Sequence, residues 1–220
     1  MNPESPFRSD EAYAGSLYVV VAPSGAGKTS LVRALLGRHP GLQLSISHTT
    51  RQPRPGETDG VDYFFVSQQD FETRRDDGEF IESALVHGNL YGTSGNWISD
   101  RIATGDDILL EIDWQGAVQV QERFPDAVGI FVAPPSIDEL RTRLKRRGQD
   151  AEEVIEQRVV AAARELREAK RFEYVIINQD FASALDELDS VVKASRARYR
   201  QQCARHSKLF DSMEMLPGSS

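Results

Sequence analysis

The residues with the clearest chemical character are Lys28 and Thr29, which follow a run of small residues at positions 24–27. Small residues let the backbone curl until several N–H groups point to one centre, and such a centre binds an anion. In the pattern G-x-x-x-x-G-K-[ST], the lysine contacts the outer phosphates of a nucleotide and the hydroxyl holds Mg²⁺. Ala22 stands where this pattern has its first glycine. The motif predicts a nucleoside triphosphate and magnesium, but it does not specify the reaction.

The residues on both sides of this loop fit a buried strand and a helix. Residues 17–21 form a continuous apolar and β-branched run, which is typical of a strand covered on both faces. Leu31, Leu35 and Leu36 recur at helical spacing after the loop. A helix that begins there adds unpaired N–H donors and partial positive charge. This context favours a phosphate site over the alternative, a glycine-rich turn with a surface lysine.

The composition is that of one globular α/β domain. The chain has 220 residues, 27% charged and 40% apolar, so its length allows a single domain with insertions. No apolar run approaches the roughly 20 residues of a membrane span, and the N-terminus lacks a signal-peptide pattern, so we expect a cytoplasmic protein that binds no membrane. A net charge of −8 argues against a general nucleic-acid binder. Cys203 is the only cysteine, which excludes an intrachain disulfide and a zinc site built from cysteines.

Strand and helix patterns alternate through most of the chain and predict a parallel sheet flanked by helices. Strands are expected at residues 17–21, 42–46, 107–113, 128–132 and 173–178, each of them buried or half-buried. The block from about 45 to 92 lacks this alternation and is interpreted as a β-rich insertion, with a strand at 61–66, a helix capped by Ser67 and a hairpin at 79–91. Residues 1–14 are expected to be a loose tail, and residues 196–220 a polar, frayed end.

Two more helices are expected after the strand at 128–132. Ser136 and Glu139 match a capping box, which marks the start of a helix that ends in a basic run at 141–147. Taken alone, that run is typical of a solvated helix end favoured by the helix dipole. A second helix follows Asp150, with an apolar face predicted to consist of Val154, Ile155, Val159, Ala162 and Leu166.

Two arginines of the insertion lie on a proline-rich loop. Arg51 and Arg54 are three residues apart, and Pro53 and Pro55 stiffen the segment that carries them. Guanidinium groups are planar and bidentate, so such a pair can form a fork around one phosphate. From the residues alone, solvated surface arginines are the preferred interpretation.

Two carboxylates end the strand predicted at 107–113. Glu111 and Asp113 are separated by one residue, so they share a face of the strand. They lie at the carboxyl end, where open α/β sheets bind ligands, and near a phosphate loop they suit a site for Mg²⁺ or water. The alternative is that they cap the following helix.

Together these segments resemble guanylate kinase over residues 15–195. The resemblance rests on several motifs in the same order: Ala22-Pro-Ser-Gly-Ala-Gly-Lys-Thr29, Ser47-His-Thr-Thr-Arg-Gln-Pro-Arg-Pro-Gly-Glu57, Tyr91-Gly-Thr93, Ile112-Asp-Trp-Gln-Gly116 and Arg146-Arg-Gly148. The phosphate loop is common to many families, whereas the segment that begins at Ser47 is very specific.

The resemblance implies an α/β fold of the P-loop NTPase type. Its parallel-sheet core would comprise about 15–44, 96–136 and 171–195, with a β-rich GMP-binding insertion at about 45–95 and a helical lid at about 137–170. The implied activity is phosphoryl transfer from ATP to GMP, giving ADP and GDP, in purine nucleotide metabolism and GMP recycling. The implied cofactor is Mg²⁺ and the implied partners are ATP and GMP, while a homo-oligomer is left open.

The resemblance also implies roles for individual residues. The implied ATP-binding residues are Ala22, Pro23, Ser24, Gly25, Ala26, Gly27, Lys28, Thr29 and, near the adenine, Asn178. The implied GMP-binding residues are Ser47, Arg51, Arg54, Glu57, Tyr63, Glu82, Tyr91, Thr93, Glu111 and Asp113, of which Ser47 and Glu82 would read guanine. The implied catalytic residues are Lys28, Arg51, Arg147 and Arg158. Thr29 would hold the metal, with Glu111 or Asp113 acting through water.

Two positions depart from the family pattern, and two alternative functions follow from the same fold. Glu111 stands where aspartate is usual, which puts its contact in doubt because its side chain is one methylene longer. Thr93 replaces a common serine but keeps the hydroxyl. A non-catalytic interaction module would be favoured by a broken phosphate loop or lost arginines, and neither is seen. A kinase for another nucleoside monophosphate would depend on how Ser47 and Glu82 read the base.

Overall fold

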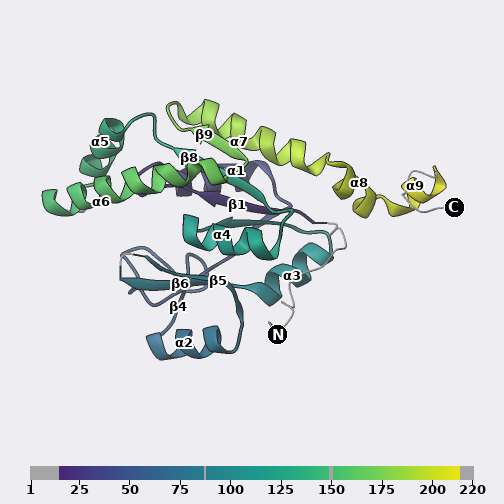
Figure 1. Ribbon diagram of the computed structural model, residues 1–220, viewed down its shortest axis with the longest axis horizontal. Coiled ribbons are helices and arrows are strands. Elements are labelled where there is room, and N and C mark those ends of the chain that lie inside the picture. Colours follow the sequence, from purple (N-terminus) through teal and green to yellow (C-terminus); the bar gives the residue numbers. More distant parts are fainter. Residues whose placement is uncertain (1–14, 87, 149–150, 214–220) are drawn as a thin grey trace.

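The computed structural model describes residues 15–86, 88–148 and 151–213, without the side chain of Arg147. The tail predicted at residues 1–14 lies outside these residues. A five-stranded parallel sheet forms the centre of the fold, in the order β2-β7-β1-β8-β9 (Figure 1). Its strands are β1 (Leu17–Val21), β2 (Leu42–Leu44), β7 (Asp107–Glu111), β8 (Val128–Ala133) and β9 (Tyr174–Ile177). The predicted α/β class with a parallel sheet is confirmed.

Helices cover both faces of this sheet, because alternate residues of a strand point to opposite sides. On one face, Tyr18 and Val20 belong to a cluster with residues of α1 (Lys28–Arg38) and α7 (Phe181–Arg196). On the other face, Val19 and Val21 belong to a cluster with residues of α4 (Trp114–Arg123). Figure 1 shows α7 above the sheet and α4 below it. The sheet is therefore the middle of three layers.

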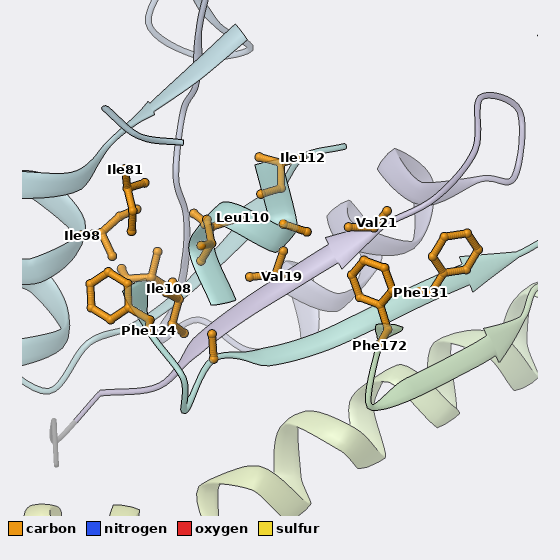
Figure 2. Close-up of a cluster of buried hydrophobic side chains, with 14 of the residues drawn as sticks. Val19, Val21, Ile81, Ile98, Ile108, Leu110, Ile112, Phe124, Phe131 and Phe172 are labelled. Carbon is orange, nitrogen blue, oxygen red and sulfur yellow. The ribbon is translucent and has the colours of Figure 1, made fainter. Parts of the chain in front are cut away.

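The face that α4 covers also anchors the insertion. Figure 2 shows Ile81 of β5 (Phe80–Val86) and Ile98 of α3 (Gly95–Ala103) beside Ile108 and Phe124 of the core. All four side chains are buried. Burial of such a side chain contributes roughly 1.5–3 kcal/mol, so a shared apolar cluster joins the insertion to the core.

The insertion carries a four-stranded sheet in the order β4-β3-β6-β5. Strands β5 and β6 form the predicted hairpin, and the other elements are β3 (His48–Thr49), β4 (Phe64–Phe65), β6 (Asn89–Ser94) and helix α2 (Gln68–Asp76). The hydroxyl of Ser67 accepts a hydrogen bond from the Asp70 N–H at 3.1 Å, which confirms the predicted cap of α2. The strand predicted at 61–66 is reduced to two residues, because the Asp62 carboxylate accepts the Thr58 N–H and closes a turn before it.

Two helices occupy the region interpreted as a lid. They are α5 (Ile137–Arg147) and α6 (Glu152–Glu165), and a short 3-10 helix, η1 (Leu166–Arg171), follows. The Ser136 hydroxyl accepts the Glu139 N–H at 3.0 Å, so the predicted cap is confirmed. Ile155, Val159 and Ala162 are buried in one cluster with residues of α5. The prediction that Val154 joins this face is wrong, because Val154 lies on a different stripe of α6 and is 38% exposed.

The C-terminal region differs from the predictions at two places. The strand predicted as buried at 173–178 is buried on one face only, because Ile176 is buried whereas Val175 and Ile177 are about half exposed at this edge of the sheet. Where a frayed end is predicted after α7, helices α8 (Tyr199–Arg205) and α9 (Ser207–Ser212) extend away from the core (Figure 1). None of the helices in the described part of the chain has the length and apolar character needed to cross a bilayer.

One buried carboxylate fastens α7 and α8 to the sheet. Asp107, the first residue of β7, accepts hydrogen bonds from the Ser16 N–H at 2.8 Å, from Arg196 Nε at 2.6 Å and from Arg205 Nη2 at 2.5 Å. The carboxylate is buried, while both arginines are partly exposed. Asp107 is therefore a shared acceptor for the residue before β1 and for the consecutive helices α7 and α8, all of which lie far from it in the sequence.

We predict that Asp107→Ala lowers the free energy of unfolding by about 3 kcal/mol, because it removes the acceptor of a buried N–H group and of two guanidinium groups. Urea unfolding measures this change. The control is Asp106→Ala, whose carboxylate pairs at 3.2 Å with the more exposed Arg101 and should contribute less than about 1 kcal/mol. Equal losses in the two variants would contradict the assigned role of Asp107.

Candidate active site

A cleft of about 400 Å³ opens at the carboxyl ends of β1 and β7, where parallel α/β sheets bind ligands. Its wall is formed by the core, the insertion and the end of α6. The predicted site residues that line it are Ala22, Pro23, Ser24, Gly25, Gly27, Lys28, Thr29, Ser47, Tyr63, Glu82, Tyr91, Glu111 and Asp113. The structure thus brings residues of the phosphate loop and of the insertion to one cavity.

The phosphate loop connects β1 to α1, as predicted, and two glycines permit its shape. Gly25 and Gly27 have φ angles of 92° and 96°, a left-handed conformation that residues with a Cβ rarely adopt. Gly27 is also the N-cap of α1, so the first N–H groups of the helix lie at the cleft. Such N–H groups bind phosphates.

Asn178 supports this loop from the side away from the cleft. Its side-chain amide is buried and donates a hydrogen bond to the Ala26 carbonyl at 2.7 Å. A Cβ on Gly27 would lie 2.4 Å from the same amide nitrogen. Neither Ala26 nor Asn178 lines the cleft, and the hydrogen bond between them supports the loop.

Helix α5 packs directly on the phosphate loop. Ala26 is fully buried in a cluster with Leu140 and Leu144, and a Cβ on Gly25 would lie 3.1 Å from the Leu144 side chain. Arg143, one residue of the basic run at 141–147, donates to the Asn178 carbonyl at 3.0 Å. The position of α5 is therefore coupled to the phosphate loop through apolar contacts and a hydrogen bond.

Lys28 and Thr29 extend toward the end of β7. Lys28 Nζ donates to the Ile112 carbonyl at 2.8 Å, and the Thr29 hydroxyl donates to Glu111 Oε1 at 2.5 Å. Desolvation lowers the pKa of the Lys28 ammonium, while the carboxylates of Glu111 and Asp113 act in the opposite direction. A cation, a hydroxyl and carboxylates therefore lie together at this end of the cleft.

The donor set around Thr29 suits magnesium. Mg²⁺ prefers oxygen ligands and is usually held by one or two carboxylates together with substrate phosphates and water. Thr29 and Glu111 offer a hydroxyl and a carboxylate in contact with each other. Across residues 15–86, 88–148 and 151–213, no group of three or more His, Cys, Asp or Glu side chains could hold a metal. The Thr29 hydroxyl and the Glu111 carboxylate therefore fit an ion that takes further ligands from phosphate and water.

Asp113 has a structural role as well as a place at the cleft. Its Oδ1 accepts the Gly116 N–H at 2.8 Å and caps α4. The alternative interpretation of this residue as a helix cap is therefore confirmed. The same residue lines the cleft, so the cap also fixes a carboxylate there.

A buried polar cluster forms the insertion side of the cleft. Glu82, which is 3% exposed, accepts a hydrogen bond from the Thr93 hydroxyl at 2.5 Å, and the Ser47 hydroxyl lies 3.2 Å from that of Thr93. Burial raises the pKa of the Glu82 carboxyl to about 7, although the hydrogen bond from Thr93 acts to lower it. Carboxyl groups perturbed in this way are concentrated at functional sites.

The carboxylate of Glu82 lies tightly against the start of α4. A Cβ on Gly116 would be 2.4 Å from Glu82 Oε2. Any larger residue at this position would displace either the carboxylate or the helix. Gly116 therefore allows the close approach of Glu82 to α4, and it ends the Ile-Asp-Trp-Gln-Gly segment that carried part of the resemblance.

Arg51 belongs to a network within the insertion. Its guanidinium pairs with Glu57 at 2.8 Å, donates to the Tyr91 hydroxyl at 3.2 Å and lies 5.3 Å from the centre of the Tyr63 ring. The side chain is only 13% exposed, so the interpretation of Arg51 as a solvated surface arginine is wrong. Arg54 is exposed, and its backbone N–H donates to Glu57 at 2.7 Å.

Tyr63 and Tyr91 connect this network to the cleft, since both line it and their rings meet edge to face at 5.9 Å. Burial raises the pKa of Tyr63 to about 12. Its hydroxyl therefore stays protonated near neutral pH and can donate a hydrogen bond.

The remaining predicted residues lie outside the cleft wall. Thr93 is fully buried next to Glu82, and Arg51, Arg54 and Glu57 lie beyond the two tyrosines. Arg158 is half-buried on α6. The structure does not describe the side chain of Arg147, so its predicted contact stays a prediction.

Sequence reasoning missed one carboxylate of the cleft. Glu165 ends α6 and lines the cavity, and burial raises the pKa of its carboxyl. It follows Arg158 by seven residues, which places both on one stripe of the helix. That spacing is the signal that could have identified it.

Comparisons with known proteins identify the family of this chain. The family model for guanylate kinase matches residues 14–195. The chain is 56% identical over 200 residues to the guanylate kinase of Aromatoleum aromaticum, covering 91% of this chain and 98% of that protein, and 56% identical over 207 residues to that of Bordetella pertussis, covering 94% and 96%. The crystal structure of guanylate kinase from Anaplasma phagocytophilum superposes with a TM-score of 0.76 at 31% identity, covering 94% of this chain and 98% of that one. The chain belongs to the guanylate kinase family.

Proposed function

We propose that the cleft is the place where this chain transfers a phosphoryl group from ATP to GMP, giving ADP and GDP. The observation that carries this proposal is that one cavity is lined both by the phosphate loop with Lys28 and by the buried Glu82 and Ser47. One end suits a triphosphate and the other suits the polar edge of a purine. ADP formation from ATP with GMP, AMP, UMP and CMP as acceptors tests the proposal, and equal rates with all four would refute it.

Guanine is read by Glu82 and Ser47. Its N1–H and N2 amine are adjacent donors that an ionised Glu82 accepts together, and its O6 accepts from the Ser47 hydroxyl. Thr93 supports this reading because its hydroxyl donates to Glu82 and lies near that of Ser47. Asp113 lies close by, since a Cβ on Gly116 would meet both Glu82 Oε2 and Asp113 Oδ1.

The phosphate of GMP is held by the arginines and tyrosines of the insertion. Arg51, Arg54, Tyr63 and Tyr91 offer guanidinium and hydroxyl donors around one anion. Glu57 contributes by fixing Arg51 through its carboxylate. A phosphate gives Arg51 a second anionic partner, which stabilises its position further.

The triphosphate of ATP occupies the loop at residues 22–29. The loop N–H groups and Lys28 contact the phosphates, and Lys28 exchanges its bond to the Ile112 carbonyl for one to a phosphate oxygen. Asn178, near the adenine in the family pattern, maintains the loop through Ala26. Magnesium, when bound, neutralises phosphate charge, and Thr29 would hold it with Glu111 or Asp113 acting through water.

The chain needs no strong general base for this reaction, because the attacking group is an oxygen of the GMP phosphate that is already anionic. The protein supplies positioning and charge neutralisation. Lys28 and Arg51 bring the two anions together and compensate the charge that develops between them. The lid arginines Arg147 and Arg158 add charge from the other side when α5 and α6 close, which also keeps out water that could accept the phosphoryl group.

Nothing favours the alternative functions. A non-catalytic interaction module has no need of an intact phosphate loop, which this chain keeps with Lys28 and Thr29 in place. A kinase for another monophosphate would need a different reader of the base than Glu82. The substrates ATP and GMP are small molecules found in the cytoplasm, and we assign the protein to that compartment on the basis of its reaction.

We predict that Lys28→Ala leaves a folded protein whose turnover falls by roughly 10² or more, because a charge contact to the transferred group is lost. Steady-state rates with saturating ATP and GMP measure this. Lys193→Ala is the control, because Lys193 lies on α7 and is largely exposed. Turnover in Lys28→Ala close to that of the control would refute the phosphate-loop assignment.

We predict that Glu82→Gln lowers kcat/KM for GMP by roughly 10² or more and leaves the value for AMP nearly unchanged. The amide offers one acceptor where guanine presents two donors, and a site built for a polar edge rejects mismatched partners strongly. The matched control is Glu79→Gln, whose carboxylate pairs with Arg74 on the insertion. An unchanged ratio of GMP to AMP efficiency in Glu82→Gln would show that another residue reads the base.

We predict that kcat/KM for GMP rises with pH through neutrality. Only the ionised Glu82 accepts both guanine donors, and its pKa of about 7 means that the neutral form predominates at lower pH. A profile from about pH 6 to about pH 8 measures this, because kcat/KM reports groups of the free enzyme. The GMP phosphate itself titrates at about pH 6. The variant Glu82→Gln should keep only the pH dependence that comes from this phosphate. Identical profiles for the two proteins would contradict the prediction.

A further inference from the structure

The strand that carries Glu82, β5, has a helix rather than another strand along one of its edges. In the part of the chain that the structure describes, β5 is the edge of the insertion sheet and pairs with β6 only. Its other edge faces helix α4. Gly116, Gln119 and Arg123 follow one another at i, i+3 and i+7, so they share the face of α4 that meets β5.

The side chain of Gln119 takes the place of a neighbouring strand at Ser83. Its Oε1 accepts the Ser83 N–H at 3.2 Å, and its Nε2 donates to the Ser83 carbonyl at 3.0 Å. Only this orientation of the amide satisfies both backbone groups. A strand neighbour would offer the same donor and acceptor pair. Ser83 is therefore held on the edge where β6 does not reach it.

These bonds lie directly after an irregularity in β5. The register against β6 shifts between Phe80 and Glu82, which is a β-bulge. Phe80 packs against Phe71 of α2 at 4.7 Å between ring centres, whereas Glu82 lines the cleft. In a regular strand these two side chains would point to the same face, so the bulge redirects Glu82.

A bulge interrupts the ladder that would otherwise fix the backbone. Helix α4 compensates on both sides of it. Arg123 Nη1 donates to the Phe80 carbonyl at 3.0 Å before the bulge, and Gln119 binds Ser83 after it. Gly116, about one turn before Gln119 on the same helix, lies against Glu82 Oε2. One face of α4 therefore sets both the backbone on either side of Glu82 and the wall behind its carboxylate.

We propose that Gln119 is a positioning residue for guanine recognition, because its two bonds to Ser83 hold the bulged strand so that both oxygens of Glu82 face the base. The inference rests on the proposed role of Glu82 as the reader of guanine. Two parallel hydrogen bonds to N1–H and the N2 amine require a fixed orientation of the carboxylate. AMP makes no such pair, so its use does not depend on that orientation.

The test compares Gln119→Met with Gln121→Met. Methionine keeps approximate length and volume but cannot bond to Ser83, and Gln121 lies on the same helix near Gly129 rather than near β5. In Gln119→Met we expect kcat/KM for GMP to fall by about tenfold through a higher KM for GMP, with AMP efficiency and the KM for ATP within about twofold of wild type. Gln121→Met should keep the wild-type ratio of GMP to AMP efficiency.

A purely structural role would lower the efficiencies for GMP and AMP equally, and that result would overturn the proposal. Combining Gln119→Met with Glu82→Gln gives a second criterion. If Gln119 acts through Glu82, the double variant should match Glu82→Gln within about twofold, whereas additive losses would overturn the proposal.

If Gln119→Met does not fold, Gln119→Glu is used, because it keeps the acceptor for the Ser83 N–H and loses the donor for the carbonyl. The same loss of GMP preference is expected there, and an unchanged ratio would overturn the proposal.

The single variant Glu82→Gln distinguishes a failure of the inference on Gln119 from a failure of the proposed role of Glu82. If it lowers the ratio of GMP to AMP efficiency while Gln119→Met does not, the inference on Gln119 is rejected and the role of Glu82 stands. If Glu82→Gln keeps the wild-type ratio, the role of Glu82 is rejected, and the inference on Gln119 is rejected with it.

Discussion

The burial of the Glu82 carboxylate is the interaction on which the rest of the site depends. A carboxylate removed from water is unfavourable unless hydrogen bonds replace those of the solvent. Thr93 supplies one such bond, and the pKa of about 7 shows that the cost is not fully offset. A purine edge with two adjacent donors would complete the set of partners. The unfavourable burial of the Glu82 carboxylate in the free site and the selectivity for guanine then have the same origin.

Two close approaches at glycine join the parts of the molecule around this cleft. Gly116 lets α4 of the core meet Glu82 of the insertion, and Gly27 lets the phosphate loop meet Asn178 at the end of β9. In both places a polar group lies where a Cβ would be. The lack of a side chain at these two glycines therefore allows the phosphate loop and Glu82 to lie close to their neighbours.

Much of the fold followed from the sequence, because strand and helix patterns have strong local signals. The strand before the phosphate loop, the caps at Ser67 and Ser136 and the parallel sheet were all predictable from such signals. The exposed faces of Val154 and of β9 were not, since they depend on which helices cover them in space. The burial of Arg51 by Glu57 and two tyrosines also arises only from tertiary contacts, and the residues alone pointed to the surface.

The positions of Glu82 and Gln119 also could not be predicted from the residues alone. Without the family resemblance, Glu82 would be interpreted as an ordinary strand residue, because the bulge that redirects it and the helix face that holds it are set by distant segments.

The most direct test of the proposed role of Glu82 is a crystal structure of this chain with GMP bound. It should place both carboxylate oxygens of Glu82 about 2.7–3.1 Å from guanine N1 and N2. A guanine edge more than about 3.5 Å from Glu82, or bonded to other side chains, would contradict the account.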